Sequence, residues 1–432
     1  MRIGILTINY FPERLGIGRV ADELSTGLEQ RGHDVVVITS FPHYPEFEVH
    51  SEYRWALLRR EHRSERLEVL RSFVHASPHA TFAAKASWYG SFTGSSMLNL
   101  ARAGRLDALI VMSPPPTLCV SAAAWRGFRR TPIVLSLQDI VPDAAIAYRL
   151  MTNKAVIAAF KGLERFAYRV SSEIAVVAPG FRSNLVRKGV HPDKITVIPN
   201  WVDTDAIVPL ERVNGFRDKH GLGAADFVVL YAGNIGMSQG LEVILEAADR
   251  LRAHEGIRFL IVGAGTTQKD LIQLANAMRL SNIAFLQPDQ DASSMYGAAD
   301  VALVLQRANV LDINFPSKIA VVMASGTPMV AGLNPAGDAA QVVSEADAGL
   351  LIEPGNAREL AVALLRLRDD RALSRRYGES GRRYALANFS RQAAMEAYEK
   401  LIRKAARGAR RSGGSPAGDH HADGADHNPE VE

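Results

Sequence analysis

The stretch MRIGILTINYFPERLGIGR, residues 1–19, joins an apolar, strand-like run to a turn that contains two glycines. A second stretch of the same kind, FVVLYAGNIG, occupies residues 227–236. Each predicts a strand, a glycine turn and a helix, with the helices expected over residues 19–31 and 241–254. Glycine lets backbone N–H groups approach an anion, and the positive end of a helix dipole favours phosphate. The repeat therefore predicts two doubly wound domains with a ligand site between them.

Other short apolar runs are rich in β-branched residues and lack polar alternation, which is typical of parallel strands covered on both faces. The predicted strands are 1–10, 34–39, 107–112, 133–137, 173–177 and 195–198, then 227–232, 258–262, 283–286, 301–305 and 328–331. Helical patterns alternate with them. The predicted fold class is therefore α/β, with two Rossmann-like parallel-sheet domains facing a central cleft.

The turn-rich segment from Pro199 to Gly215 is the expected domain junction. We expect an N-terminal domain over residues 1–205 and a C-terminal domain over 206–390. A polar helix over 391–407 is expected to cross back to the N-terminal domain. The tail 408–432 is almost without apolar residues and is expected to be disordered.

The composition, with 47% hydrophobic and 22% charged residues among 432, indicates a soluble globular protein. The net charge of +4 suits an anionic substrate or membrane surface, and we expect no nucleic-acid partner. The single cysteine, Cys119, excludes an intramolecular disulfide and fits a reducing cytoplasm. We find no signal-peptide pattern and no uncharged apolar run of the ~20 residues that span a bilayer. The expected location is the cytoplasm.

Residues 80–100, ATFAAKASWYGSFTGSSMLNL, mix aromatic side chains with few charges. Basic residues flank this segment in the sequence: Arg54, Arg59, Arg60, Arg63, Arg66, Arg71, Arg126, Arg129 and Arg130. Aromatic groups beside basic ones suit the inner face of an anionic membrane. A core helix with charged neighbours explains the pattern about equally well, so both interpretations stay open.

Several motifs together resemble the family 4 glycosyltransferases of the two-domain GT-B type, and within them the colanic-acid-type branch. They are NYFPERLGIGRVADELSTGLEQRGHDVVVIT at 9–39, FPHYPEFEV at 41–49, DALIVMSPPPTLCV at 107–120, SLQDIVPDAA at 136–145, YAGNIGMSQGLE at 231–242 and NFPSKIAVVMASGTPMVA at 314–331. The resemblance covers nearly all of residues 1–400.

This resemblance implies a retaining transfer of a hexosyl or deoxyhexosyl group from a nucleotide-diphosphate sugar to a glycan or lipid-linked acceptor. The N-terminal domain would bind the acceptor and the C-terminal domain the donor, in exopolysaccharide biosynthesis. Backbone N–H groups, lysine and arginine can neutralise the leaving diphosphate without metal. We expect no metal and no cofactor, and the Asp-x-Asp at 203–205 is interpreted as turn chemistry.

The implied donor-facing residues come from two glycine loops: Gly16 and Gly18 in the first, and Gly233, Asn234, Gly236 and Gln239 in the second. Many relatives carry an arginine and a lysine where this chain has Asn234 and Gln239. The positive charge is therefore expected from elsewhere.

Lys318 is the main candidate for that charge. It follows Pro316 and Ser317, where a loop enters a predicted helix that Ser317 can cap. Arg307, just past a strand, is the second candidate. The alternative is that Lys318 is only a surface charge.

The family's Glu-x7-Glu signature is absent, because Ile313 and Val321 occupy its two positions. Asp312 could replace the first carboxylate, while valine cannot accept a hydrogen bond from the nucleotide ribose. Asp139 resembles the family's acceptor-side residue and would orient the acceptor hydroxyl, or else cap a turn. His43 is a substrate-binding candidate at the rim of the cleft.

Alternative functions stay open. One is a nucleotide-sugar epimerase of GT-B fold, and another is a non-catalytic GT-B scaffold that has lost the glutamates. A Rossmann oxidoreductase fits less well, because the first turn lacks a full G-x-G-x-x-G and no acidic residue ends the strand at 34–39.

Overall fold

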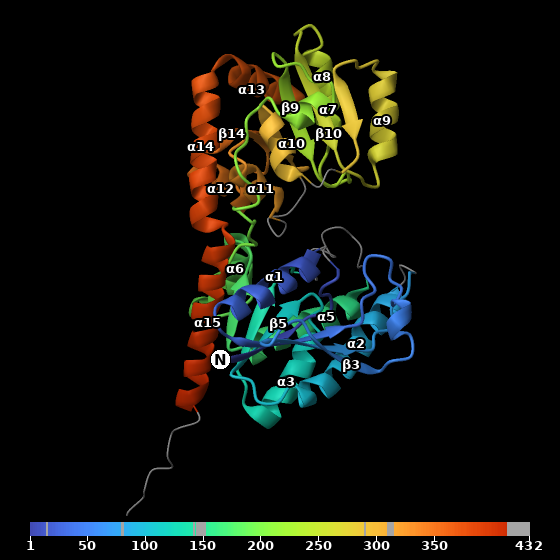
Figure 1. The fold of residues 1–432 in the computed structure, drawn as a ribbon, viewed down its shortest axis with the longest axis vertical. Helices are drawn as coiled ribbons and strands as arrows, with labels where there is room; N and C mark the ends of the chain where they lie inside the picture. Colours follow the sequence, from blue (N-terminus) through green and yellow to red (C-terminus); the bar gives the residue numbers. More distant parts are fainter. Residues whose placement is uncertain are drawn as a thin grey trace, which may run out of the picture.

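The computed structural model describes residues 1–13, 16–78, 82–140, 143, 153–288, 291–308 and 315–412. These residues form two α/β lobes, one above the other in Figure 1. The prediction of two Rossmann-like parallel-sheet domains is confirmed.

The N-terminal lobe is built on an eight-stranded sheet in the order β3-β4-β2-β1-β5-β6-β7-β8. Every neighbouring pair is parallel except β3 with β4. The strands are β1 Arg2–Leu6, β2 Asp34–Ser40, β3 Leu58–His62, β4 Leu67–Ser72, β5 Ala108–Ser113, β6 Ile133–Leu137, β7 Glu173–Val176 and β8 Ile195–Val197. The helices are α1 Gly16–Gln30, α2 Phe82–Arg102, α3 Leu118–Arg129, α5 Lys154–Val170 and α6 Pro179–Arg187.

The C-terminal lobe is built on a parallel six-stranded sheet in the order β11-β10-β9-β12-β13-β14. The strands are β9 Phe227–Ala232, β10 Ile257–Val262, β11 Ile283–Leu286, β12 Val301–Leu305, β13 Met329–Gly332 and β14 Gly349–Ile352. The helices are α7 Gly215–Lys219, α8 Glu242–Arg250, α9 Gln268–Ala277, α10 Ala292–Ala298, α11 Lys318–Ala324, α12 Asp338–Glu345, α13 Ala357–Asp369, α14 Arg371–Asn388 and α15 Arg391–Ser412.

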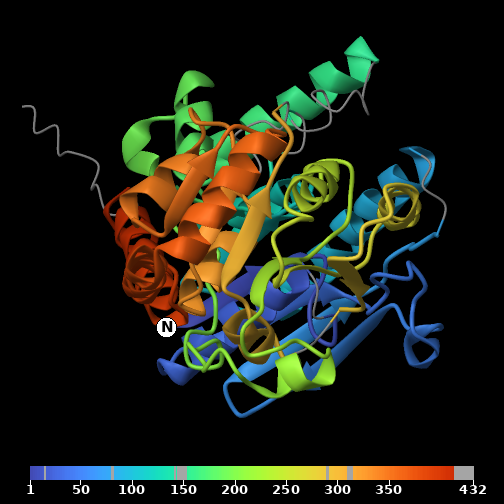
Figure 2. The same ribbon diagram turned by 90° about the horizontal axis from the view of Figure 1, so that it is seen from above.

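The last helix, α15, packs on the N-terminal lobe although it follows the C-terminal lobe in sequence. Met395, Tyr398 and Ile402 enter the apolar core between α1 and one face of the first sheet. The Tyr398 hydroxyl lies 2.8 Å from that of Ser136, and Glu399 accepts a hydrogen bond from Arg31 at 3.0 Å. Figure 1 shows α14 and α15 in series along both lobes, and Figure 2 shows them nearly end-on at one edge.

The chain therefore crosses between the lobes twice, through the linker after β8 and at the junction of α14 and α15. The two crossings touch, because the Val202 N–H donates to the Phe389 carbonyl at 2.9 Å. Val202 and Ser390 also form a parallel β-bridge.

Three strands were missed by the sequence analysis: β3, β4 and β14. The five residues of β3, LRREH, are almost all polar because this edge strand is antiparallel and largely exposed. In β4 a glutamate and an arginine interrupt the apolar pattern, although Arg71 is only 3% exposed and is paired with Glu61. The first strand ends at Leu6 rather than residue 10, and α1 begins at Gly16 rather than residue 19.

The aromatic segment 80–100 corresponds largely to α2, and one face of that helix is in the core. Phe92 and Leu100 are buried, whereas Leu98 is 48% exposed. Arg71, proposed as part of the neighbouring basic surface, is buried and does not contribute to it. Within the described part of the chain, none of the helices combines the length and apolarity needed to cross a bilayer.

We predict that Gly378→Ala destabilises the C-terminal lobe, because a Cβ there would lie 2.1 Å from the Gly326 carbonyl oxygen. Forcing α14 away from that backbone should lower the free energy of unfolding by about 1–3 kcal/mol. Urea denaturation followed by circular dichroism measures it. The matched control is Gly162→Ala in α5, where an added Cβ meets no neighbouring atom within 4 Å. This substitution should stabilise the chain by up to about 1 kcal/mol, because alanine favours the helix more than glycine does. Equal effects of the two substitutions would contradict the packing argument.

Candidate active site

The loop after β9 packs backbone to backbone against the loop after β10. Gly233 has φ +138° and Gly263 has φ +149°, conformations that favour glycine. A Cβ on Gly263 would lie 1.9 Å from the Gly233 carbonyl oxygen, and the Ile235 N–H donates to Ala264 at 2.9 Å. These glycines therefore allow the carboxyl ends of two adjacent strands to form one compact rim.

Lys318 reaches this rim from the start of α11. A Cβ on Gly233 would lie 3.1 Å from the Lys318 Nζ, which sits 3.8 Å from the centre of the Tyr231 ring. The Nζ is inaccessible to solvent and has no hydrogen-bond partner among the residues that the structure describes. This desolvation lowers the pKa of Lys318 to about 7. Lys318 is therefore a buried amine under the glycine loop, not a surface charge.

Asn234 and Gln239 converge on the same loop. A Cβ on Gly236 would lie 2.8 Å from the Asn234 Nδ2 and 3.1 Å from the Gln239 Oε1. The Gln239 Oε1 is buried, and no described residue donates a hydrogen bond to it. The structure thus brings Gly233, Asn234, Gly236, Gln239 and Lys318 together, as the sequence analysis expected.

Arg307 lies beside this group, but its side chain braces the loop. Its Nε donates to the Met237 carbonyl at 2.6 Å and its Nη2 to Glu242 at 2.7 Å. Because Glu242 pairs with its charge, Arg307 is a weaker source of positive field than we expected.

The capping role expected of Ser317 is wrong. Ser317 has helical φ and ψ, and its side chain makes no cap hydrogen bond. The Ile319 N–H instead donates to the Pro316 carbonyl at 3.1 Å. Because residue 317 already follows the helical path, its hydroxyl is not directed at the free N–H groups.

A buried carboxylate that the sequence analysis missed, Glu13, organises the facing N-terminal lobe. Its Oε1 accepts hydrogen bonds from the backbone N–H groups of His43 and Tyr44, both at 2.7 Å. Its Oε2 accepts one from Asn9 at 2.8 Å. Gly18 is needed beside it, since a Cβ there would lie 2.5 Å from the Glu13 carbonyl oxygen. One carboxylate thus ties the loops after β1 and β2 to the start of α1.

His43 belongs to this internal network, and its assignment to the cleft rim is wrong. Its side chain has no exposed surface. The Nδ1 lies 2.8 Å from the Phe41 carbonyl, and the Nε2 accepts from the Trp88 indole at 2.8 Å. Burial lowers the pKa of His43. Both ring nitrogens therefore have hydrogen-bond partners inside the lobe, because the loop after β2 turns inward next to Glu13.

Gly16 and Asp139 are exposed on the N-terminal lobe. Gly16 opens α1 with φ +51°, and nothing would contact a Cβ there. Asp139 follows β6, and surrounding protein raises the pKa of its carboxyl by desolvation. Burial raises the pKa of the nearby Tyr89 hydroxyl, and the charge of Asp139 adds to this effect. Asp312 lies outside the described residues.

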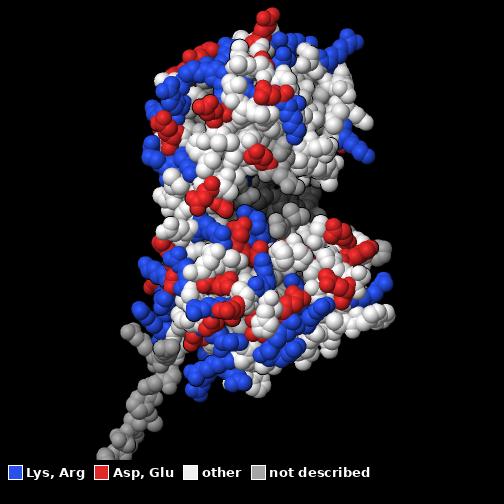
Figure 3. Space-filling view, in the orientation of Figure 1, with Lys and Arg blue, Asp and Glu red and all other residues white. Residues whose placement is uncertain are grey.

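A notch separates the two lobes in Figure 3. Asp338 at the start of α12 accepts a hydrogen bond from the Gly180 N–H at the start of α6, so the lobes touch beside the crossings. The aromatic ring of Phe315 packs against both the N-terminal and the C-terminal core. The notch is therefore closed on the side of the crossings and open away from it.

Comparison with known proteins places each lobe in a described family. Residues 15–206 match the profile "Glycosyltransferase Family 4" and residues 214–384 match "Glycosyl transferases group 1". The chain is 30% identical over 339 residues to the putative colanic acid biosynthesis glycosyl transferase WcaI of Escherichia coli K12, covering 76% of this chain and 82% of that protein.

Two solved structures share the fold. HepE of Anabaena, solved with UDP, superposes with a TM-score of 0.70 at 16% identity, over 94% of this chain and all of that chain. Sucrose-phosphate synthase of Thermosynechococcus elongatus gives a TM-score of 0.70 at 18% identity, over 93% of this chain and 98% of that chain.

We predict that the buried Lys318 amine contributes to a pH-dependent stability. Its pKa is about 7 in the folded chain and 10.5 ordinarily, so the unfolded chain binds more protons between these values. The contribution of Lys318 to the free energy of unfolding should therefore rise with pH above 7, by up to about 1.4 kcal/mol per pH unit. The net rise should be clearest between pH 7 and 9, because the raised pKa of the buried Cys119 thiol opposes it at higher pH. Urea denaturation at several pH values measures it.

The variant Lys318→Met lacks the titrating amine and should lose this rise. Lys161→Met, at an exposed lysine on α5, should keep it. Parallel stability curves for the unsubstituted chain and Lys318→Met would show that the amine is not desolvated.

Proposed function

The chain belongs to the glycosyltransferases that join a family 4 domain to a group 1 domain, and we propose that it is a retaining, metal-independent member. It takes a hexosyl or deoxyhexosyl group from a nucleotide-diphosphate sugar and transfers it to a glycan or lipid-linked acceptor. The similarity to WcaI supports a place in exopolysaccharide biosynthesis. The UDP bound to HepE, which has the same fold, supports a nucleotide donor.

The observation that carries the proposal is the buried Lys318 amine beneath the Gly233 loop, which pairs with no residue in the described part of the chain. The diphosphate becomes more negative as the bond to the sugar breaks, so a cation placed there stabilises the transition state more than the bound donor. An approaching diphosphate favours the protonated amine, since a nearby negative charge raises the pKa of a lysine. Lys318 therefore supplies the charge that Asn234 and Gln239 lack.

The N-terminal lobe supplies the acceptor side. Asp139 lies exposed after β6 and orients the acceptor hydroxyl. Gly16 allows close approach of the donor, while Glu13 holds the surrounding loops in place. Asp312 would supply a carboxylate near the transferred sugar.

Incubation with UDP-, GDP-, ADP- and dTDP-sugars tests the reaction class. We expect one donor to release its nucleoside diphosphate in the presence of acceptor and without added divalent metal. Conversion to an isomeric nucleotide sugar would instead establish an epimerase, and binding without turnover a scaffold.

With the active donor, we predict that Lys318→Ala lowers kcat/KM while the fold survives. Losing a desolvated charge contact to phosphate should cost about 2–4 kcal/mol of transition-state stabilisation, a fall of about 10²–10³-fold. Lys161→Ala, the exposed control, should retain full activity. A kcat/KM close to that of the unsubstituted enzyme would refute the role of Lys318.

We also propose that the N-terminal lobe docks on the inner face of the cytoplasmic membrane. Trp55 is 95% exposed, and exposed Leu57 accepts a backbone hydrogen bond from Phe73, which is also exposed. Ser95 of α2 donates to the Phe73 carbonyl at 2.6 Å, so this patch adjoins α2. Aromatic and apolar groups beside exposed Arg54 and other surface arginines suit anionic lipid.

Vesicle flotation tests this docking. We predict that the protein floats with anionic vesicles at low salt and is released at high salt, because each basic residue contributes about 1 kcal/mol within a Debye length. Trp55→Ser should weaken flotation, whereas Val362→Ser, at an exposed residue of α13 on the other lobe, should not. Failure to float with either anionic or neutral lipid would refute the docking.

A further inference from the structure

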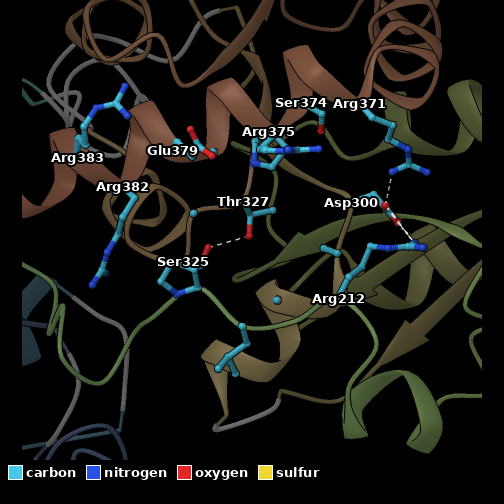
Figure 4. A pocket seen from close by; sticks show the side chains of 17 residues that line it. Arg212, Asp300, Ser325, Thr327, Arg371, Ser374, Arg375, Glu379, Arg382 and Arg383 are labelled. Carbon is cyan, nitrogen blue, oxygen red and sulfur yellow. Dashed lines mark hydrogen bonds and ion pairs between the residues drawn. The ribbon is translucent and has the colours of Figure 1, made fainter.

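A second cavity lies away from the glycine loops, on the flank of the C-terminal lobe. Its volume is about 660 Å³, and it is bounded by α14, the linker at 209–212 and the loop at 325–328 (Figure 4). Asp300 and Pro328 directly precede β12 and β13, so the cavity opens at the amino ends of these strands. The glycine loops lie at the opposite, carboxyl edge of the same sheet.

The lining of this cavity is strongly basic. Five arginines face two acidic residues: Arg212, Arg371, Arg375, Arg382 and Arg383, against Asp300 and Glu379. Figure 4 shows Arg212 and Arg371 reaching Asp300 from opposite sides.

Asp300 has no capacity left to neutralise the other arginines. Its buried carboxylate pairs with Arg371 at 2.7 Å, with buried Arg217 at 2.8 Å and with Arg212 at 3.2 Å. It also accepts the Val228 N–H at 2.8 Å. The cluster around Asp300 therefore carries an excess of positive charge before the remaining arginines are considered.

The other three arginines form no ion pair with any described residue. Arg375 and Arg383 are exposed on α14. Arg382 donates its hydrogen bonds to backbone carbonyls, which carry no net charge. Glu379, one turn from both exposed arginines, makes no salt bridge with them within the described chain. The Ser374 hydroxyl lies on the same wall.

Arg382 also couples the cavity to the crossings between the lobes. Its guanidinium donates to the Thr204 and Ile207 carbonyls of the linker at 2.9 and 2.7 Å, and to Ala324 at the end of α11 at 2.7 Å. The linker and α14, which form two walls of the cavity, are the segments that meet at Val202 and Phe389. A ligand bound between these two walls would hold the linker against α14.

We propose that this cavity binds a small anion with two or more phosphate groups, and that the bound anion stiffens the linker against α14. Guanidinium groups match phosphate oxygens with paired hydrogen bonds, and they stay charged at any physiological pH. The cavity is larger than one phosphate requires and lies within the size range of small-molecule sites. This site is separate from the donor site and does not depend on the proposed transfer reaction.

The test is calorimetric titration of inorganic pyrophosphate at constant ionic strength into four proteins. The unsubstituted chain should show two sites, since the donor loop also binds diphosphate. Lys318→Ala should lose one site and keep the other. The double variant Arg375→Ala/Arg383→Ala should bind about tenfold or more weakly at the second site only.

The matched control is Arg358→Ala/Arg366→Ala, which removes two exposed arginines from α13. It should leave both sites unchanged. If it weakens binding as much as the α14 variant, the effect is diffuse charge and the proposal is overturned. Complete loss of pyrophosphate binding in Lys318→Ala also overturns the proposed cavity site. That result would still be consistent with the proposed donor site at Lys318.

Hydrogen exchange gives an independent readout. Pyrophosphate should slow amide exchange over residues 203–212 in the unsubstituted chain and in Lys318→Ala, but not in the α14 variant. Unchanged exchange in all of them would refute the stiffening. If the double variant does not fold, the single variant Arg375→Gln gives the same comparison with a smaller expected loss.

Discussion

The hydrogen bond from Val202 to Phe389 fastens together the two passages of the chain between its lobes. It is placed there because α15 contributes Met395, Tyr398 and Ile402 to the N-terminal core and cannot leave that lobe without exposing them. The linker and the α14–α15 junction therefore lie against each other where they pass between the lobes. Figure 3 shows a notch between the two lobes, which touch beside these crossings through Asp338 and Gly180.

On the C-terminal side of the notch, the proposed phosphate site centres on the desolvated Lys318 amine. Gly233 and Gly263 bring two loops into backbone contact, and Lys318 lies beneath them with a pKa near neutrality. Asn234 and Gln239 are neutral, so in the proposed site the positive field would depend on protonation of Lys318, which a nearby diphosphate would favour.

The N-terminal side depends on hydrogen bonding more than on charge. Glu13 accepts backbone N–H groups from the loop after β2, and His43 is locked between a carbonyl and the Trp88 indole. A buried carboxylate with this many donors orients the loops it joins, since leaving any donor unpaired in the interior would cost about 1–3 kcal/mol. In the C-terminal lobe, hydrogen bonds also fix a connecting segment. Arg382, which lines the arginine-rich cavity, donates to the Thr204 carbonyl of the linker.

The sequence alone determined the two α/β domains, because buried parallel strands need continuous apolar runs and glycine turns have a distinct local pattern. It also singled out the loop around Gly233 and Lys318, which the structure places next to each other. The edge strand β3 was not predicted from the sequence, since its residues are largely exposed to solvent and carry no apolar pattern. Only the tertiary structure decided that Glu13 is buried, that His43 points inward, that Arg307 is paired and that five arginines line one cavity. Each of these facts depends on which distant segments pack together, and local sequence does not encode that information.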